Sequence, residues 1–293
     1  MRRALPSVAV AMVPRLEMEW FMAQRRLPTL AAALAFAAPH AHAQLSSGIT
    51  AAAFSWEEGH REQALAAVLQ VAPTPWLLLG AVPTVLRVQR APGAQSQFGL
   101  ADLPVYAAVF HSGRSLARPT IAVTGSASVP TGDQSRGLGR GFSLMSAELA
   151  LAADPAPGLT IRGGAARLLR VGGDAPRGLS TTTLFGDVVL GSRSLTSLAL
   201  GGYGELAGEA PAGYETARGL TATLAHTLRG GTTLVLGAGR TVAGSGPNWS
   251  FSLGIGTAFG GVSPVGATAP VVSGGVPRTV GSGPSPLCAI ARC

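Results

Sequence analysis

The chain has few cysteines and no lysine. Its two cysteines, Cys288 and Cys293, lie at the extreme C-terminus, so no disulfide framework can hold the body of the chain together. Neither has metal-ligand spacing to a histidine. All 22 basic residues are arginine, and between residues 44 and 260 there are 15 arginines against 12 acidic residues, with no cluster longer than a pair. Although the isoelectric point is near 11.1, we therefore expect no nucleic-acid partner.

The sequence also lacks stretches that could hold a long helix. Its 40 glycines and 21 prolines are spread through the chain, and both residue types are unfavourable inside helices. One apolar run, residues 64–86, is long enough to suggest a transmembrane helix, but Pro73, Pro75 and Pro83 interrupt it. We interpret this run as two shorter segments joined by a turn, and a spanning helix as the weaker alternative.

Residues 22–43 have the parts of a secretory signal peptide. Arg25 and Arg26 form the charged region, Leu27–Ala38 the apolar region, and Ala41-His42-Ala43 the cleavage site. The apolar region is shorter than the roughly 20 residues that span a bilayer, although an anchoring helix that is never cut is an alternative. We expect cleavage after Ala43 and export of a chain that begins at Gln44.

The two ends of the sequence fit neither the signal peptide nor the body of the chain. Residues 1–21 match no targeting signal, and we interpret them as a mis-assigned extension upstream of Met22. Residues 261–293 are rich in glycine, proline and serine and have no usable periodicity. This tail is either a disordered extension or the product of a misread stop, and we favour the second interpretation.

The body of the chain, residues 44–260, shows alternation with a period of two. Between Asn248 and Phe259, large apolar side chains at odd positions alternate with serine, glycine and alanine at even positions. The pattern predicts twelve strands, most of them long enough to cross a bilayer at a tilt. They cover approximately 48–56, 62–71, 76–88, 98–110, 119–129, 141–153, 158–169, 181–190, 195–206, 214–228, 232–240 and 248–259.

The connections between these segments alternate in length. Four of the five even-numbered connections are short, whereas the odd-numbered ones are longer, up to the stretch 130–140. Short periplasmic turns that alternate with longer outer loops are typical of bacterial outer-membrane barrels, which have an even number of strands. The predicted fold is therefore all-β, a membrane-spanning antiparallel up-and-down β-barrel of about twelve strands.

Three short motifs resemble a known family. Gly99-Leu100-Ala101-Asp102 is similar to a Gly-Leu-Gly-Asp motif, with alanine in place of the second glycine. Val129-Pro130-Thr131-Gly132-Asp133, followed by Gly137-Leu138-Gly139, is similar to a Leu-Pro-Thr-Gly-Asp and Gly-x-Gly signature, and Gly237-Ala238-Gly239-Arg240, followed by Pro247-Asn248-Trp249-Ser250, is similar to a final hairpin. On these three motifs the chain resembles the outer-membrane barrel family of the phenol-degradation meta-pathway, over roughly residues 47–259. Outer-membrane barrels usually end on an aromatic residue, as Phe259 would be, yet 34 residues follow it here. The motif residues are Gly99, Leu100, Asp102, Pro130, Thr131, Gly132, Asp133, Gly137, Gly139, Gly239, Arg240, Pro247 and Trp249.

The alternation also places some charged residues opposite the apolar face. These lumen-facing candidates are Arg87, Asp102, Glu148, Arg162 and Asp187. Their mixed charges could shape what passes through the barrel, or they could form salt bridges that fill it. The glycine-rich stretch 130–140 is not followed by a helix, so we interpret it as a flexible outer loop and not as a phosphate-binding site.

We expect no catalytic site, metal site or cofactor. His60 and His111 fall in connections at opposite ends of the predicted barrel, and His226 lies near a strand end, so they cannot converge on a metal. The resemblance implies passive or facilitated passage of small organic compounds, with aromatic compounds as candidates. It also implies outer-membrane lipid and the barrel-assembly machinery as partners. The alternatives are a non-conducting structural or binding barrel and an enzyme with a serine and histidine site at the rim.

Overall fold

The computed structural model describes residues 44–56, 59–74, 76–111, 113, 115–139, 141, 143–171, 180–192, 194–207, 215–228, 231–244 and 246–259. The expected signal peptide, the upstream extension and the tail 261–293 lie outside these ranges. Within them, no helix is long and apolar enough to cross a membrane.

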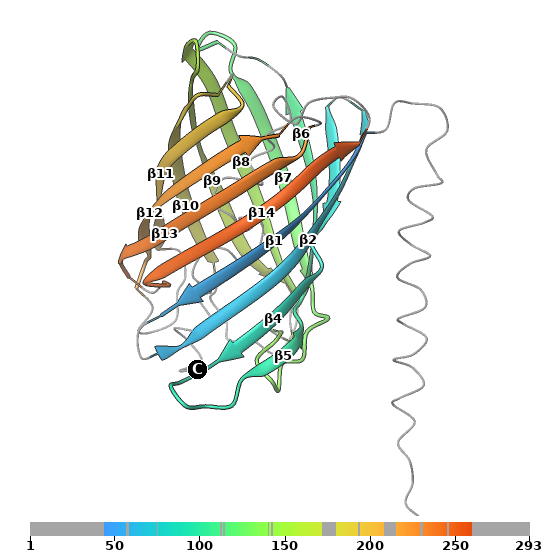
Figure 1. Ribbon diagram of the computed structural model, residues 1–293, viewed down its shortest axis with the longest axis vertical. Helices are drawn as coiled ribbons and strands as arrows, with labels where there is room; N and C mark the ends of the chain where they lie inside the picture. The colour runs from blue at the N-terminus through green and yellow to red at the C-terminus, as the bar shows by residue number, and fades with distance from the viewer. Residues whose placement is uncertain are drawn as a thin grey trace, which may run out of the picture. The chain divides into compact units, whose positions relative to one another are not determined.

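The described part of the chain is a single antiparallel β-sheet that closes on itself (Figure 1). Closure follows from β1, which pairs with β14 on one side and with β2 on the other. The strands are β1 (Gln44–Ser55), β2 (Arg61–Thr74), β3 (Leu77–Ala81), β4 (Thr84–Gln89), β5 (Gln97–Leu100), β6 (Leu103–His111), β7 (Thr120–Val129), β8 (Ser143–Ala156), β9 (Leu159–Val171), β10 (Ser180–Leu190), β11 (Thr196–Ala207), β12 (Arg218–Thr227), β13 (Thr233–Ala243) and β14 (Trp249–Phe259).

These fourteen elements form twelve wall strands, because β3 with β4 and β5 with β6 each occupy one place in the wall. β3 and β4 pair with β2 in one continuous register, and Pro83, which has no N–H to donate, separates them. The predicted closed antiparallel barrel of about twelve strands is confirmed.

The break between β5 and β6 is a β-bulge. Ala81 pairs with Val105, and Val85 pairs with Leu100, so the segment from β5 to β6 contains one residue more than the segment opposite. A bulge of this kind bends its strand and redirects a side chain. Asp102 lies in this bulge, between the end of β5 and the start of β6.

The two faces of the wall differ as the alternation predicts. On β14, Leu253 and Ile255 are 55% and 48% exposed on the outer face, while the alternate residues Ser250, Ser252 and Gly254 face the interior, which we call the lumen. Large apolar side chains are exposed in the same way on most other strands. An apolar outer face is what a barrel surrounded by lipid requires.

The β3–β4 wall strand has the opposite orientation to the one that we expected. Leu78, Val82 and Val88 are buried on the lumen face, and Arg87 is exposed on the outer face beside Gln63. The expectation of an inward Arg87 was therefore wrong. Both faces of this strand are apolar, so alternation offers little contrast between them, and the charge of Arg87 was a misleading marker.

The two ends of the barrel carry different connections. Leu45 of β1 pairs with Phe259 of β14, so β1 begins and β14 ends at the same end of the barrel. At this end the short connections 75–76, 157–158, 191–195 and 228–232 join neighbouring strands. The longer connections 90–96, 130–142, 172–179 and 208–217 join strand ends at the other end of the barrel, as does the shorter 244–248. The connection 112–119 is the one long connection among the short ones, as the sequence indicated. Gly158 shows why a tight turn needs glycine: its φ is +77° although nothing lies within 4 Å of the position that a Cβ would occupy.

Candidate functional site

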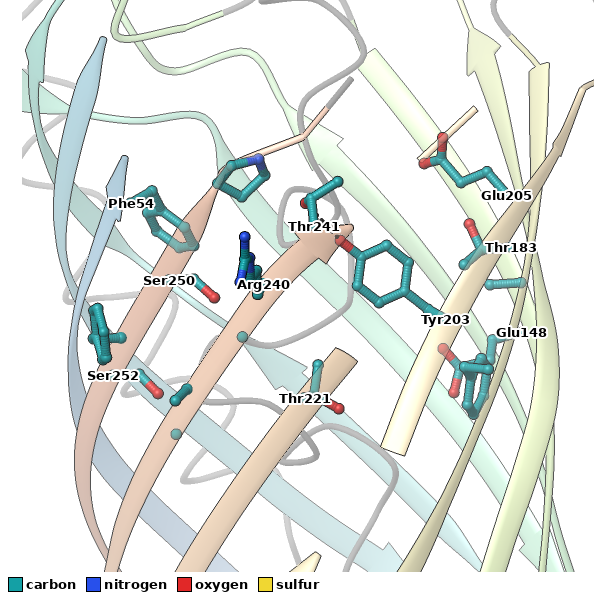
Figure 2. Close-up of a pocket in the computed structure, with 17 residues that line it drawn as sticks. Phe54, Glu148, Thr183, Tyr203, Glu205, Thr221, Arg240, Thr241, Ser250 and Ser252 are labelled. Carbon is teal, nitrogen blue, oxygen red and sulfur yellow. Dashed lines mark hydrogen bonds between the residues drawn. The ribbon is translucent and has the colours of Figure 1, made fainter. Parts of the chain in front are cut away.

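A cavity of about 110 Å³ lies along the inner wall, nearer the end with the longer connections (Figure 2). Its lining is a mixture of aromatic rings, hydroxyl groups and carboxylates from strands β1, β8 to β14 and the connection after β13. The lining includes Phe54, Glu148, Thr183, Phe185, Tyr203, Glu205, Thr221, Thr241, Ser250 and Ser252.

Tyr203 lies flat against the wall of this cavity. It is the cross-strand partner of Gly219, and a Cβ added to that glycine would lie 2.5 Å from the tyrosine Cε1 atom. The ring therefore covers the glycine of the next strand. Its hydroxyl group is 3.1 Å from the Thr241 hydroxyl of β13, toward which it points in Figure 2. The missing side chain of Gly219 thus lets an inward aromatic residue leave the lumen clear.

The same arrangement occurs twice more around the wall. Phe185 is paired with Gly164, whose added Cβ would lie 2.6 Å from the phenylalanine Cζ atom. Tyr106 is paired with Gly80 and covers it in the same manner. The packing of an aromatic ring over a cross-strand glycine is a known way to stabilise a sheet that contains glycine. Sequence alternation identified none of these pairs, because it contains no information on register.

Two carboxylates, those of Glu148 and Glu205, line the cavity. Glu205 is buried at 7% exposure, pairs with Thr183, and its Oε2 accepts a hydrogen bond from the Ala217 backbone N–H at 3.0 Å. Glu148 lies on the lumen face of β8, paired with Thr124. Both glutamates are labelled among the lining residues in Figure 2. Each carboxylate brings an acceptor group to this part of the lumen.

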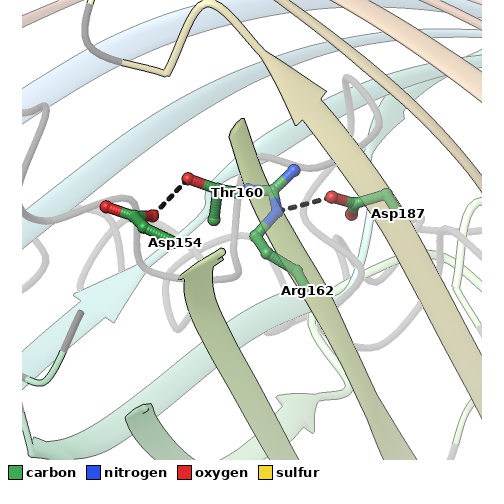
Figure 3. Close-up of polar contacts among 4 residues, drawn as sticks. All are labelled: Asp154, Thr160, Arg162 and Asp187. Carbon is green, nitrogen blue, oxygen red and sulfur yellow. Dashed lines mark hydrogen bonds and ion pairs between the residues drawn. The ribbon is translucent and has the colours of Figure 1, made fainter. Parts of the chain in front are cut away.

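Arg162 and Asp187 also lie on the lumen face, where they form an ion pair (Figure 3). They are cross-strand partners on β9 and β10, and Nε of the arginine is 2.6 Å from Oδ1 of the aspartate. The side chains are 18% and 6% exposed. Because the two charges neutralise each other, this pair adds rigidity to the wall and little net charge to the lumen.

Asp102 has a different role from the one that the alternation suggested. The bulge between β5 and β6 directs it at the connection 130–142, where Oδ1 accepts the Gly132 backbone N–H at 3.0 Å. Beside it, the Thr131 hydroxyl donates to the Ala101 carbonyl at 2.9 Å. Two motifs that are separate in the sequence therefore meet in one contact.

The rest of this connection is folded onto the same place. Leu138 is 3% exposed, and its Cδ1 lies 2.7 Å from the position of a Cβ at Gly99, on the lumen face of β5. A Cβ at Gly139 would lie 2.5 Å from the Gly132 backbone, so both glycines are needed for close approach. The connection lies at the end that was expected, but within the described residues 130–139 Gly132 and Gly139 serve for close packing.

Asp133 holds the turn inside this connection. Its carboxylate accepts hydrogen bonds from the Ser135 hydroxyl at 2.7 Å and from the Arg136 backbone N–H at 3.2 Å. The Ser135 hydrogen bond is the main cause that lowers the pKa of Asp133 below its ordinary value. Arg136 then reaches β5, where it donates to the Gln97 side chain and to the Phe98 carbonyl.

The third motif lies on the outside of the barrel. The Arg240 guanidinium is 4.9 Å from the centre of the Trp249 ring, and both side chains are exposed on the outer face. Between them, Gly239 makes room for the Ser250 hydroxyl, and the Thr241 N–H bonds to the Pro247 carbonyl at 3.2 Å. These residues fix the last hairpin, and Arg240, Gly239, Pro247 and Ser250 also belong to the lining of the cavity.

The three histidines are separated. His60 is buried beside Glu62, with Nε2 2.9 Å from Oε1, near the end with the longer connections. His111 ends β6 at the opposite end, and His226 is exposed with Nδ1 2.8 Å from the Thr196 hydroxyl. In the described ranges, no group of three or more histidine, cysteine or acidic residues could hold a metal ion.

Comparison with solved structures places this barrel among known architectures. The chain is similar to the COG4313 outer membrane channel from Pseudomonas putida F1, with a TM-score of 0.61 and 14% identity over 74% of this chain and 95% of that one. The likeness shows a shared barrel fold. Weaker similarities are to the KdgM porin (TM-score 0.48, 10% identity, 73% and 99% covered) and to the translocator domain of the autotransporter NalP from Neisseria meningitidis (0.46, 13%, 83% and 97%). No protein-family model and no curated protein sequence matches the chain.

Proposed function

We propose that this barrel is an outer-membrane channel through which small organic solutes pass passively. The observation that supports the proposal best is the position of the inward aromatic rings. Tyr203 and Phe185 lie on glycines of the neighbouring strand instead of across the barrel, and the cavity beside them is lined by polar groups. A barrel whose only task was structural would gain more from rings that packed across the interior.

The lining favours small amphipathic solutes that contain an aromatic ring. The rings of Phe54, Phe185 and Tyr203 offer apolar surface, and hydroxyls and carboxylates lie around them. A cavity of about 110 Å³ suits a compound of about one ring, since a cavity of roughly 150 Å³ in another protein holds benzene. Binding would be weak, because a channel must release what it admits. The motif resemblance to the phenol-degradation barrels agrees with this substrate class.

The proposed location follows from the outer face. A belt of exposed leucine, valine and isoleucine side chains surrounds the barrel and would contact outer-membrane lipid. Insertion would use the barrel-assembly machinery, with the last strand β14 and its terminal Phe259 as the proposed recognition segment. Membrane fractionation and a change of gel mobility on boiling test this location, and recovery as soluble periplasmic material would contradict it.

The channel activity is tested with purified protein whose folding is first checked by that gel shift. Planar-bilayer recordings should give discrete conductance steps, and liposomes should swell in single-ring aromatic alcohols faster than in disaccharides. Folded protein that conducts nothing and causes no swelling would favour the alternative, a structural or binding barrel. Joint substitution of His60, His111 and His226 should leave permeation unchanged, because these residues lie apart from the cavity lining.

A further inference from the structure

Charge is sorted between the two faces of the barrel. Among strand residues whose side chains the structure describes, the acidic ones share the lumen face: Glu62, Glu148, Asp154, Asp187 and Glu205. Of the arginines in this set, Arg162 faces the lumen, and the others are exposed on the outer face: Arg61, Arg87, Arg167, Arg218 and Arg240. The outer face of the described strands therefore has positive charge and no negative charge.

All five outward arginines lie toward one end of the barrel, the end with the longer connections. Arg61 and Arg218 begin their strands there, and Arg87 and Arg240 lie within three residues of strand ends. The opposite end carries apolar side chains on this face, such as Leu45 and Leu190. A random surface would not collect charge of one sign in one band, and an arginine that faced hydrocarbon would be costly.

Two of these arginines belong to one row across the wall. Ser55 of β1 pairs with Arg61 on one side and with Trp249 on the other, and Arg240 lies over the Trp249 ring. Neighbouring strands are about 4.8 Å apart, so the two guanidinium groups flank the tryptophan within about 15 Å. Tryptophan is enriched where membrane meets water, and guanidinium groups bind phosphate through paired hydrogen bonds.

We propose that this arginine row binds the phosphate groups of lipid headgroups in the membrane leaflet that faces outward. The inference rests on the proposed outer-membrane location, because it places the longer connections outside the cell. The positive band supplies the charge, Trp249 lies at the level of the headgroups, and the exposed Leu220 beside Arg240 continues into the apolar belt. Phosphorylated glycolipid is the partner whose chemistry matches both the charge and the apolar surface below it.

The test uses the full folded protein and diphosphorylated lipid A in detergent micelles, read by native mass spectrometry. Phosphatidylcholine, whose single phosphate is balanced by its own choline group, is the comparison without net charge. The variant is R61Q/R240Q. Its matched control is R118Q, which removes an exposed arginine from the connection 112–119 at the other end. At about fivefold for each arginine near an anionic surface, the double variant should bind lipid A roughly 30-fold more weakly.

R118Q should bind lipid A as the unchanged protein does, and phosphatidylcholine should bind all three proteins alike. Equal lipid A binding by the double variant, or an equal loss in R118Q, would overturn the proposal. A second measurement needs no variant: binding to the unchanged protein should weaken as sodium chloride rises, and indifference to salt would also overturn it. Conductance recorded in phosphatidylcholine bilayers tests the channel separately, because lipid A is absent there.

Discussion

Replacement of Gly219 by alanine should move an aromatic ring into the channel. The new Cβ would lie 2.5 Å from Tyr203 Cε1 and 2.6 Å from Cζ and the hydroxyl oxygen. Carbon atoms are ordinarily 3.5–4.0 Å apart, so the ring must shift by about 1 Å or more. The nearest atoms are all in the tyrosine side chain, so the ring gives way and the backbone stays in place. The open direction is the lumen.

The magnitude follows from the contacts that are lost. The hydrogen bond between the Tyr203 and Thr241 hydroxyls contributes about 0.5–1.5 kcal/mol, and the displaced ring loses packing against the strand as well. We expect Gly219→Ala to lower the free energy of unfolding by about 1–2 kcal/mol. Single-channel conductance should fall in the same variant, because the ring then narrows the passage.

A double-mutant cycle separates the ring from other effects of the substitution. In the Tyr203→Ala background, Gly219→Ala should no longer destabilise the barrel, and conductance should exceed that of the unchanged protein. Gly125→Ala is the matched control, because Gly125 has nothing within 4 Å of the added atom and shares the outer face with Val123. Zero coupling energy together with unchanged conductance in Gly219→Ala would refute the reasoning.

Three further predictions concern charge. Asp187→Asn leaves Arg162 without its partner and should destabilise the barrel by about 2 kcal/mol in urea unfolding; no change would mean that lumen water already solvates the arginine. Glu148→Gln and Glu205→Gln should each reduce a preference for cations, seen as a smaller reversal potential in a potassium chloride gradient, and an unchanged potential would mean that these carboxylates do not set the selectivity. Because the pKa of Asp133 is lowered, the hydrogen bonds that its carboxylate accepts should persist at neutral pH. They should be lost only as the pH falls through that lowered pKa, below the ordinary value of 3.8. Hydrogen exchange of the Arg136 amide measures this loss, and protection that disappears at a higher pH would contradict the prediction.

Much of the fold was accessible from the sequence because a barrel wall is a local, periodic structure. Strands such as β14 show one apolar face and one face of small polar residues, which can be recognised from the strand's own sequence. The positions of the turns between strands can also be predicted from local sequence. The alternation failed where it lost contrast. In β3–β4 both faces are apolar, so Arg87 was assigned to the lumen although the register with β2 places it outside.

The candidate site depended on register, which the sequence does not contain. The sequence alone does not show that Tyr203 lies opposite Gly219 or that Phe185 lies opposite Gly164. Either strand could shift by two residues along its neighbour, and each side chain would still point to the same face of the sheet. The packing of residues 130–139 against β5 could not be predicted either, because it is a contact between segments that are distant in the sequence. Its glycines read as flexible, yet Gly132 and Gly139 are small because they touch each other and Asp102.

The sequence by itself determined that this chain forms a closed wall with an apolar outside and a polar inside, because period-two patterning selects a face for each side chain. Only the tertiary structure decided which residues share a level of the wall. That choice sets an aromatic ring against a glycine, pairs Arg162 with Asp187, and lines up Arg61 with Trp249. Its physical cause is the pairing of whole strands, whose register is fixed by closure of the sheet and not by any one strand alone.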